Sequence, residues 1–289
     1  MSELQHSVGE LIRLSTQYLS EKGCASPRLD AEVLLGHVLG LSRVELYLNL
    51  DKPLTNEEVD QYRILIGRRG QRIPVAYLTG NREFYSLPLT VQPGVLIPRP
   101  ETELLVEKVI QLVSGDLDQE DETISILELG TGSGAIALAL ACESPCIQVT
   151  AVDISPTALE TAKLNAEKLE VADQIHFIQS DLFKEVDGTY SVICSNPPYI
   201  PSQEMLTLQP EVSREPKVAL DGGEDGLTFY RRIMDQAASF LEQPGFVVLE
   251  IGWNQGDAVR LIGENKGFQW LETIPDYGGH DRVVVFQWH

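Results

Sequence analysis

The chain has 289 residues, which is enough for one large α/β domain or for a domain with a smaller companion. Hydrophobic residues make up 43% and charged residues 22%, a balance typical of globular proteins, and no apolar run approaches the roughly 18–20 residues that a membrane span needs. The N-terminal residues also lack the uniform apolar core of a secretory signal, so we expect a cytoplasmic protein. The net charge of −21 disfavours DNA binding, because phosphate contacts supply most nonspecific affinity for nucleic acid.

Cysteine and histidine positions give no indication of a metal site. No Cys-x-x-Cys pair occurs and the five histidines show no ligand spacing. A chain of this length without a secretion signal is not expected to carry a disulfide framework. We therefore expect no bound metal, and four free thiols in apolar surroundings at Cys24, Cys142, Cys146 and Cys194.

Residues 1–80 are predicted to form a small helical bundle. Apolar residues recur at i, i+3 and i+4 between positions 8 and 19, as in an amphipathic helix. Ser42 with Glu45, and Thr55 with Glu58, match the capping box that opens a helix. These segments are short, so we expect them to share one apolar core.

A run of arginines without an acidic residue ends this helical region. It is interpreted either as a solvated helix face or as a surface that contacts RNA or an acidic protein, and the sequence leaves both open. The arginines between residues 63 and 82 are Arg63, Arg68, Arg69, Arg72 and Arg82.

Residues 81–100 are predicted to form a β-hairpin linker. Apolar residues alternate at Leu87, Leu89 and Val91 and return at 95–97, on either side of a turn at 92–94. The prolines at positions 98 and 100 then stiffen the exit from the hairpin. A new helix is expected to begin near residue 104.

From residue 124 onward, apolar strands alternate with helices. This alternation predicts an α/β fold with a mostly parallel sheet and helices on both faces. The last two strands have no helix between them and should pair antiparallel. The predicted helices fall near 134–142, 156–169, 226–241 and 254–265, and the predicted strands cover about 124–129, 147–153, 175–179, 190–195, 245–251, 268–274 and 282–287.

A glycine-rich turn follows the first of these strands. Glycines permit a tight turn and let a ligand approach the bare backbone, and the start of the next helix offers N–H groups to a carboxylate or phosphate. The strand-to-helix context argues against a plain turn. We predict a cofactor-binding loop made of Gly130, Thr131, Gly132, Ser133 and Gly134.

Two aspartates after the next strands suit a nucleoside. Asp153 ends the second strand about twenty residues beyond the glycines, where a carboxylate can accept both ribose hydroxyls. Asp181 follows the third strand and could accept a hydrogen bond from an adenine amino group, with Leu182 lining the ring. Taken by itself, an aspartate at such a position more commonly caps a turn. At this stage NAD and S-adenosylmethionine both fit.

The tetrapeptide Asn196-Pro197-Pro198-Tyr199 decides between these cofactors. It ends the fourth strand, beside the glycine loop in the usual ligand crevice of an open α/β sheet. Consecutive prolines fix φ and donate no backbone hydrogen bonds, so neighbouring carbonyls are rigidly presented. The Asn196 amide oxygen and the Pro197 carbonyl can then accept both hydrogens of an NH₂ group, while Tyr199 offers a flat face to a planar group.

The tetrapeptide, the glycine loop and their spacing resemble class I methyltransferases that act on exocyclic nitrogen. Residues 80–85 (Gly-Asn-Arg-Glu-Phe-Tyr), 96–103 (Leu-Ile-Pro-Arg-Pro-Glu-Thr-Glu) and 220–227 (Leu-Asp-Gly-Gly-Glu-Asp-Gly-Leu) resemble the HemK/PrmC family of peptide chain release factor glutamine methyltransferases. The resemblance covers essentially the whole chain. One departure is Leu182, where some members carry a larger aromatic residue.

The resemblance implies a class I methyltransferase (Rossmann-like) fold with a seven-stranded sheet and S-adenosylmethionine as cofactor. It implies that residues 1–80 bind the release factor, that 81–100 form the linker and that 101–289 form the methyltransferase domain. The implied reaction is methylation of the side-chain nitrogen, N5, of the glutamine in the Gly-Gly-Gln motif of class I release factors. We expect a monomer that binds neither membrane nor DNA.

Three alternatives remain. An adenine-N6 nucleic-acid methyltransferase would share the Asn-Pro-Pro-Tyr logic, but it should carry a basic recognition region. An NAD-dependent oxidoreductase would explain Gly130 and Asp153 but would leave residues 196–199 without a role. The intact Asn-Pro-Pro-Tyr tetrapeptide argues against a noncatalytic cofactor-sensing or interaction module.

Overall fold

A computed structural model describes residues 6–115 and 123–289 of the chain. The chain divides into two compact units, the first containing residues up to Asn81 together with Gln209–Arg214, and the second containing Arg82–Leu208 and Glu215–His289. We call them the helical unit and the sheet unit. None of the described helices is long and apolar enough to span a membrane.

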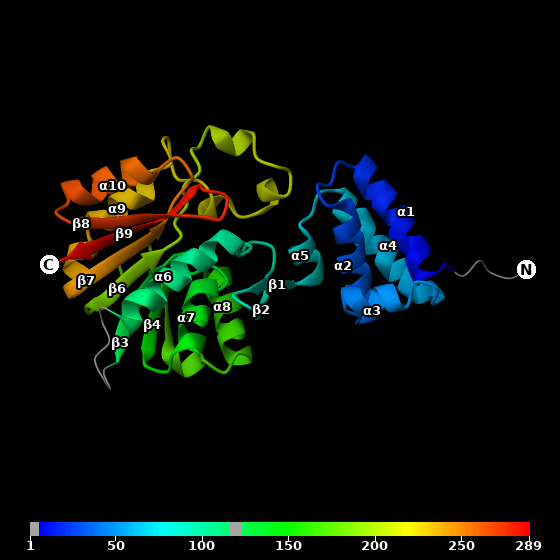
Figure 1. Cartoon of the computed structure of the whole chain (residues 1–289), viewed down its shortest axis with the longest axis horizontal. Helices are drawn as coiled ribbons and strands as arrows, with labels where there is room; N and C mark the ends of the chain where they lie inside the picture. The colour runs from blue at the N-terminus through cyan, green and yellow to red at the C-terminus, as the bar shows by residue number, and fades with distance from the viewer. Residues whose placement is uncertain (1–5, 116–122) are drawn as a thin grey trace, which may run out of the picture. The chain divides into compact units, whose positions relative to one another are not determined.

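The helical unit is built from short capped helices around one core (Figure 1). Both predicted capping boxes are present, with Ser42 and Glu45 opening α3 and Thr55 and Glu58 opening α4. The helices are α1 (Val8–Glu21), α2 (Pro27–Leu39), α3 (Arg43–Leu48), α4 (Asn56–Gly70) and α5 (Val75–Thr79).

Two acidic residues are buried in the helical unit because arginines neutralise them. Glu32, with 1% of its surface exposed, accepts hydrogen bonds from Arg28 and Arg43. Asp30 accepts one of 2.7 Å from Arg69. A buried carboxylate without such partners would strongly destabilise the fold.

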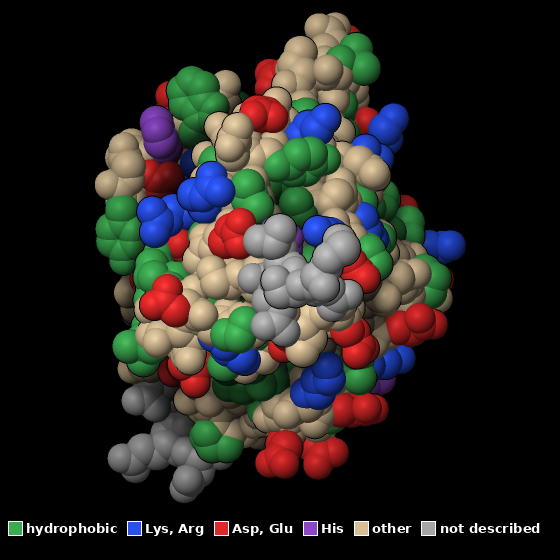
Figure 2. Space-filling view, turned by 90° about the vertical axis from the view of Figure 1, so that its right-hand side faces the viewer, with side chains coloured by type: hydrophobic (Ala, Val, Ile, Leu, Met, Phe, Trp, Pro, Cys, Tyr) green, Lys and Arg blue, Asp and Glu red, His purple; other side chains and the backbone are tan. Residues whose placement is uncertain are grey.

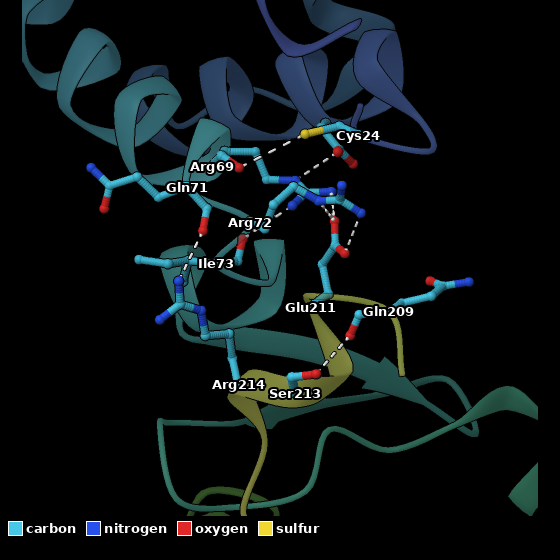
Figure 3. Close-up of polar contacts among 10 residues, drawn as sticks. Cys24, Arg69, Gln71, Arg72, Ile73, Gln209, Glu211, Ser213 and Arg214 are labelled. Carbon is cyan, nitrogen blue, oxygen red and sulfur yellow. Dashed lines mark hydrogen bonds and ion pairs between the residues drawn. The ribbon is translucent and has the colours of Figure 1, made fainter. Parts of the chain in front are cut away.

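The predicted run of arginines is therefore not a single surface. Arg69 is only 5% exposed and pairs with Asp30 and with Glu211 of the inserted segment Gln209–Arg214, while Arg72 also pairs with Glu211 (Figure 3). On the face drawn in Figure 2, basic side chains lie among acidic ones. Neither a uniformly solvated face nor a continuous basic surface describes this run, because acidic residues distant in sequence neutralise two of its members.

The two-stranded sheet of the linker region lies earlier in the chain than the sequence pattern suggested. Its strands are β1 (Asn81–Phe84) and β2 (Leu87–Thr90), and the residues between them, Tyr85 and Ser86, have φ of 50° and 60°. Residues 92–94 do form a turn, closed by a 3.1 Å hydrogen bond from Val95 to Gln92, but no strand follows it. The expected strand at 95–97 is wrong, because this backbone is bonded to a buried side chain instead, as described below.

The sheet unit carries a seven-stranded sheet in the order β5-β4-β3-β6-β7-β9-β8. β3, β4, β5, β6 and β7 run parallel to one another, whereas β9 is antiparallel to both β7 and β8. The last two strands, β8 and β9, thus pair antiparallel as predicted. The strands are β3 (Ile124–Leu129), β4 (Ile147–Asp153), β5 (Ile175–Gln179), β6 (Tyr190–Ser195), β7 (Leu241–Glu250), β8 (Gln269–Pro275) and β9 (Asp281–Trp288).

Helices cover both faces of this sheet and enclose two apolar cores (Figure 1). Alternate strand residues point to opposite faces, so Ile126 belongs to one core and Leu127 to the other. The first core packs against α6 (Glu103–Ser114), α7 (Ala135–Glu143) and α8 (Pro156–Lys168), and the second against α9 (Thr228–Met234) and α10 (Gly256–Asn265).

Two further expectations need correction. The single helix predicted over 226–241 is the short α9 followed by a 3-10 turn at Ala237–Phe240, after which β7 begins at Leu241. Of the four free cysteines, Cys24 and Cys194 are buried as predicted, but Cys142 and Cys146 are exposed. The latter two lie where α7 ends and the chain turns toward β4, outside the core face of the helix.

Candidate active site

The candidate site lies where the strand order of the sheet changes direction. The chain passes from β3 outward through β4 and β5 and then returns to place β6 on the other side of β3. Leu129 and Ser195 are register partners at the ends of β3 and β6, and the Ser195 hydroxyl donates a 2.6 Å hydrogen bond to the Leu129 carbonyl. Such a switch point opens a crevice between the loops that follow the two strands.

The glycine-rich loop follows β3 and enters α7 in a conformation that requires glycine. Gly130, Gly132 and Gly134 all have positive φ, and Gly134 has φ of 86°. A Cβ atom at Gly134 would lie 3.1 Å from the Cβ of Ala162 in α8. The loop is therefore fixed both by backbone conformation and by close packing of α7 against α8.

Glu128 precedes the loop and keeps one oxygen unpaired in the interior. Its Oε2 accepts hydrogen bonds from the Thr131 hydroxyl at 2.7 Å and from the Ala137 N–H at 3.1 Å, whereas its buried Oε1 has no partner among the described residues. Burial raises the pKa of this carboxyl to about 7, although the two hydrogen bonds act in the opposite direction. An unsatisfied buried carboxylate oxygen on a cavity wall suits a cationic ligand group.

Asp153 ends β4 and is hydrogen-bonded to the backbone of the glycine loop. Its two oxygens accept backbone hydrogen bonds of 2.8 Å, from Gly132 and from Ser155. Burial raises its pKa despite these bonds. Each oxygen retains acceptor capacity, which a pair of ribose hydroxyls could use.

Asp181 and Leu182 follow β5 and line the same cavity as the glycine loop and Asp153. Asp181 pairs with Arg232 of α9 at 2.8 Å, a contact that the sequence did not suggest. Leu182 has φ of 55°, and the Ser180 hydroxyl holds its carbonyl at 2.9 Å. The adenine contacts expected of these two residues stay predictions.

Asn196 follows β6 and has its side-chain amide held at one end. Its Nδ2 donates a 3.1 Å hydrogen bond to the hydroxyl of Thr102, the last residue of the 3-10 turn Pro100–Thr102. The other end of the amide, the oxygen Oδ1, is therefore directed away from Thr102. Asn196 is partly buried and lies on the cavity wall with Pro197 and Pro198.

These residues surround one cavity of about 260 Å³. It brings together the predicted residues of the glycine loop, Asp153, Asp181, Leu182 and the first part of the tetrapeptide. Tyr199 does not line this cavity. It lines a second cavity of about 300 Å³, together with Pro201 and Trp253. Burial raises the Tyr199 pKa to about 12.

The buried carboxylate of Glu215 explains why residues 95–97 form no strand. Glu215, with 5% of its surface exposed, accepts a 3.0 Å hydrogen bond from the Ile97 N–H and a 2.5 Å one from the Arg99 guanidinium. The backbone donor of Ile97 is thus used by a side chain rather than by a neighbouring strand. The prolines at 98 and 100 have no N–H to contribute to a sheet.

Known proteins resemble this chain over nearly its full length. The sequence model of the family described as PrmC N-terminal domain matches residues 10–80. That of the family described as Methyltransferase small domain matches residues 102–224. A protein named release factor glutamine methyltransferase from Rhodopirellula baltica is 43% identical over 97% of this chain and 96% of its own length. One of the same name from Escherichia coli is 42% identical over 99% of both chains.

This chain belongs to the release factor glutamine methyltransferase family. Its fold is also that of solved methyltransferases: a methyltransferase from Pyrococcus furiosus superposes with a TM-score of 0.51 and 20% identity, covering 79% of this chain and 98% of that one.

A turn at residues 220–222 is hydrogen-bonded to the backbone that follows the tetrapeptide. The Ile200 N–H donates to Leu220 at 3.0 Å and the Gly222 N–H to Ile200 at 2.8 Å. Gln255 also donates a 3.0 Å hydrogen bond to the Tyr199 carbonyl. Residues 220–222 therefore hold the backbone directly after the tetrapeptide, and Gln255 holds Tyr199 itself. No cluster of metal-binding side chains occurs in the described part of the chain.

Several residues in or beside this candidate site were not selected from the sequence. Thr102 lay within the Pro-Arg-Pro-Glu-Thr stretch that carried the resemblance, so its signal was present but had no assigned task. Glu128 was part of the glycine-loop motif. Glu215, Arg232 and Gln255 gave no signal, because their partners are distant in the chain.

Proposed function

We propose that this protein transfers the methyl group of S-adenosylmethionine to the side-chain amide nitrogen, N5, of the glutamine in the Gly-Gly-Gln motif of class I peptide chain release factors. The observation that carries the proposal is the position of Asn196 and Pro197 beside the glycine loop, with the Asn196 amide held by Thr102. Relatives named for this reaction, matching over nearly the whole chain, support it.

S-adenosylmethionine supplies an electrophilic methyl group when it is bound. We assign its methionyl end to the glycine loop and to Glu128, whose unpaired Oε1 can accept from an ammonium group. Asp153 is assigned to the ribose hydroxyls. The remaining proposed cofactor residues are Gly130, Thr131, Gly132, Ser133, Gly134, Asp181, Leu182 and Asn196.

The substrate amide presents a chemical difficulty that the tetrapeptide can solve. The lone pair of an amide nitrogen is delocalised, so this nitrogen is a poor nucleophile. Asn196 Oδ1 and the Pro197 carbonyl would accept both hydrogens of the NH₂ group, raise electron density on nitrogen and fix its direction of attack. Positioning of this kind lowers the barrier by several kcal/mol.

Pro198 and Tyr199 complete the proposed substrate site. Pro198 keeps the Pro197 carbonyl rigid. Tyr199 is still proposed to flank the plane of the amide, although it lines the second cavity and not the one that holds Asn196 and Pro197. No strong base is required before attack, because a methylated amide cation is very acidic and sheds its proton readily. The N–CH₃ bond would form as the S–CH₃ bond breaks, and the proton would then pass to solvent water.

We further propose a division of labour along the chain. Residues 1–80 would bind the body of the release factor, 81–100 would serve as linker and 101–289 would carry out the reaction. The protein would act in the cytoplasm as a monomer that binds neither membrane nor DNA. The acidic charge of −21 supports the last point.

The test is methyl transfer from labelled S-adenosylmethionine to three acceptors in parallel. These are a purified class I release factor, the same factor with the Gly-Gly-Gln glutamine changed to alanine, and duplex DNA containing adenine. We expect label on the intact factor alone. Label on DNA would replace the proposal with an adenine-N6 methyltransferase, and equal label on both factors would exclude the Gly-Gly-Gln glutamine as the acceptor.

A further inference from the structure

Two segments line the candidate cofactor cavity although neither forms a strand of the central sheet. The first covers residues 94–99 and the second covers residues 216–219. The loops that carry Gly130 and Asp153 follow hydrogen-bonded strands, which fix where these loops begin, but the two segments have no such support. Their cavity-lining residues are Gly94, Val95, Leu96, Pro98 and Arg99 in the first segment and Pro216, Val218 and Ala219 in the second.

Glu215 joins the two segments. It directly precedes Pro216, and its Oε2 accepts a 3.0 Å hydrogen bond from the Ile97 N–H while its Oε1 accepts a 2.5 Å one from the Arg99 guanidinium. The contacts span 118 and 116 residues of the chain. One carboxylate at the start of the second segment therefore holds both a backbone group and a side chain of the first.

The carboxylate end of this contact is protected from water. Glu215 is 5% exposed, whereas the side chain of Arg99 is 31% exposed. A buried carboxylate without a cationic partner is costly, so Arg99 is needed to keep Glu215 in the interior. Because water competes little for a buried carboxylate, the pair can hold the two segments in one arrangement, which a fully exposed ion pair does poorly.

Glu215 lies behind the cavity wall and not in it. Pro216 and Arg99 line the cavity, but Glu215 does not. The preceding residue, Arg214, belongs to the helical unit, so the second segment is not continued from an element of the sheet unit. A substitution at Glu215 can therefore affect a bound molecule only through the two segments that it joins.

We propose that Glu215 is a positioning residue for cofactor binding, which acts through Arg99 and Ile97 to hold residues 94–99 and 216–219 against S-adenosylmethionine. This inference rests on the proposed use of that cofactor. A wall that is held in place retains a bound molecule. Loss of the contact should therefore appear mainly in the dissociation rate of the cofactor and much less in its association rate.

The experiment measures the binding kinetics of S-adenosylmethionine by surface plasmon resonance on the immobilised full chain. Glu215→Gln keeps the size of the side chain and an acceptor for Ile97 but offers no charge to Arg99. We expect its dissociation rate to rise about tenfold and its association rate to stay within about twofold. The control is Glu272→Gln, which breaks the ion pair with Lys108 in the same unit. Neither of these control residues lines the cavity, so this variant should keep wild-type kinetics.

A double variant separates a positioning role from a loss of folding. Glu215→Gln alone leaves the charge of Arg99 without its partner, whereas Glu215→Gln/Arg99→Gln leaves neither charge behind. The double variant should also release the cofactor about tenfold faster, and the effects of the two single variants should be less than additive in a double-mutant cycle. Wild-type dissociation in Glu215→Gln, fully additive effects, or an equal change in Glu272→Gln would each overturn the proposal.

Amide hydrogen exchange provides a second readout that does not depend on turnover. In the wild-type protein, added S-adenosylmethionine should slow exchange in residues 95–97 and 217–219 together. In Glu215→Gln this protection should be much smaller, while that of the glycine loop remains, and equal protection of both segments in the two proteins would contradict the role of Glu215. If these effects are observed but the wild-type protein methylates no release factor, the proposed reaction fails while the positioning role of Glu215 stands.

Discussion

Arg72 binds Glu211 through two parallel hydrogen bonds of 2.6 Å, although 139 residues separate them in the chain (Figure 3). Arg69 adds a third contact of 2.8 Å to the same carboxylate. Because of these contacts, Gln209–Arg214, which lies between β6 and α9 in sequence, belongs to the helical unit. The chain therefore leaves the sheet unit after Leu208 and returns to it at Glu215.

Replacing Glu211 by glutamine should destabilise the helical unit. Arg69 is almost fully buried, and losing one partner leaves part of its charge uncompensated. We expect a loss of about 1–3 kcal/mol, measured as faster hydrogen exchange of α4 amides in the full chain. The matched control is Glu204→Gln, an exposed residue nearby in sequence, and similar exchange in both variants would contradict the role of Glu211.

The contribution of Glu211 should also depend on pH. Burial alone would raise its pKa, but the hydrogen bonds from Arg72 and Arg69 outweigh burial and lower it from 4.5 to about 2. A carboxyl with a depressed pKa stabilises the fold above its unfolded-state value, and this stability is lost as pH falls from about 4.5 toward 2. The difference in α4 exchange between wild type and Glu211→Gln should therefore shrink below about pH 4; a constant difference would show that the carboxylate charge is not responsible.

Asn196→Ala should remove turnover while leaving the cofactor bound. The variant lacks one of the two proposed acceptors for the substrate NH₂ group, so we expect kcat to fall by about 100- to 1000-fold, the range seen when one group that stabilises a transition state is removed. Calorimetry should show a much smaller loss of affinity for S-adenosylmethionine than of kcat, because the other proposed cofactor residues are unchanged. Asn265→Ala, at the exposed end of α10, is the control, and parallel losses of binding and turnover in Asn196→Ala would contradict the assignment.

Glu128→Gln should weaken cofactor binding. The variant keeps the size of the side chain and can still accept from Thr131 and Ala137, but it no longer offers a charge to an ammonium group. A hydrogen bond to a charged group is worth about 1.5–3 kcal/mol, so the dissociation constant should rise by about 10- to 100-fold. Glu143→Gln at the exposed end of α7 should leave it unchanged, and tight binding by Glu128→Gln would exclude the ammonium contact.

Gly222→Ala should disturb the tetrapeptide from behind. An added Cβ would lie 2.8 Å from the Cα of Tyr199 and 2.9 Å from that of Gly226, so backbone must move. We expect kcat to fall by about tenfold or more, because small displacements of reacting groups are costly. Gly67→Ala, where an added Cβ meets no atom within 4 Å, should keep full activity, and the same result for Gly222→Ala would show that the turn does not support the site.

The sequence alone predicted the features that depend on local pattern. Apolar residues marked β3, β4, β5 and β6 at their observed bounds. The signal is continuous in β3 and β6, which are buried on both faces, and is interrupted by exposed polar residues in β4 and β5. The capping boxes at Ser42 and Thr55 marked helix starts, because their hydrogen bonds span only three residues. The glycine loop and the tetrapeptide were recognisable for the same reason, because each motif consists of a few consecutive residues.

Tertiary structure decided what depends on partners far apart in the chain. The Thr102 hydroxyl meets Asn196 across 94 residues, and the buried Arg69 meets Asp30 across 39, so neither pairing leaves a periodic signal. The same holds for Glu215, which takes the backbone donor of Ile97 and so prevents the strand that local alternation predicted. The type of a residue and its local pattern determine which bonds the residue can make. The fold determines which partner the residue reaches and whether water competes for that bond.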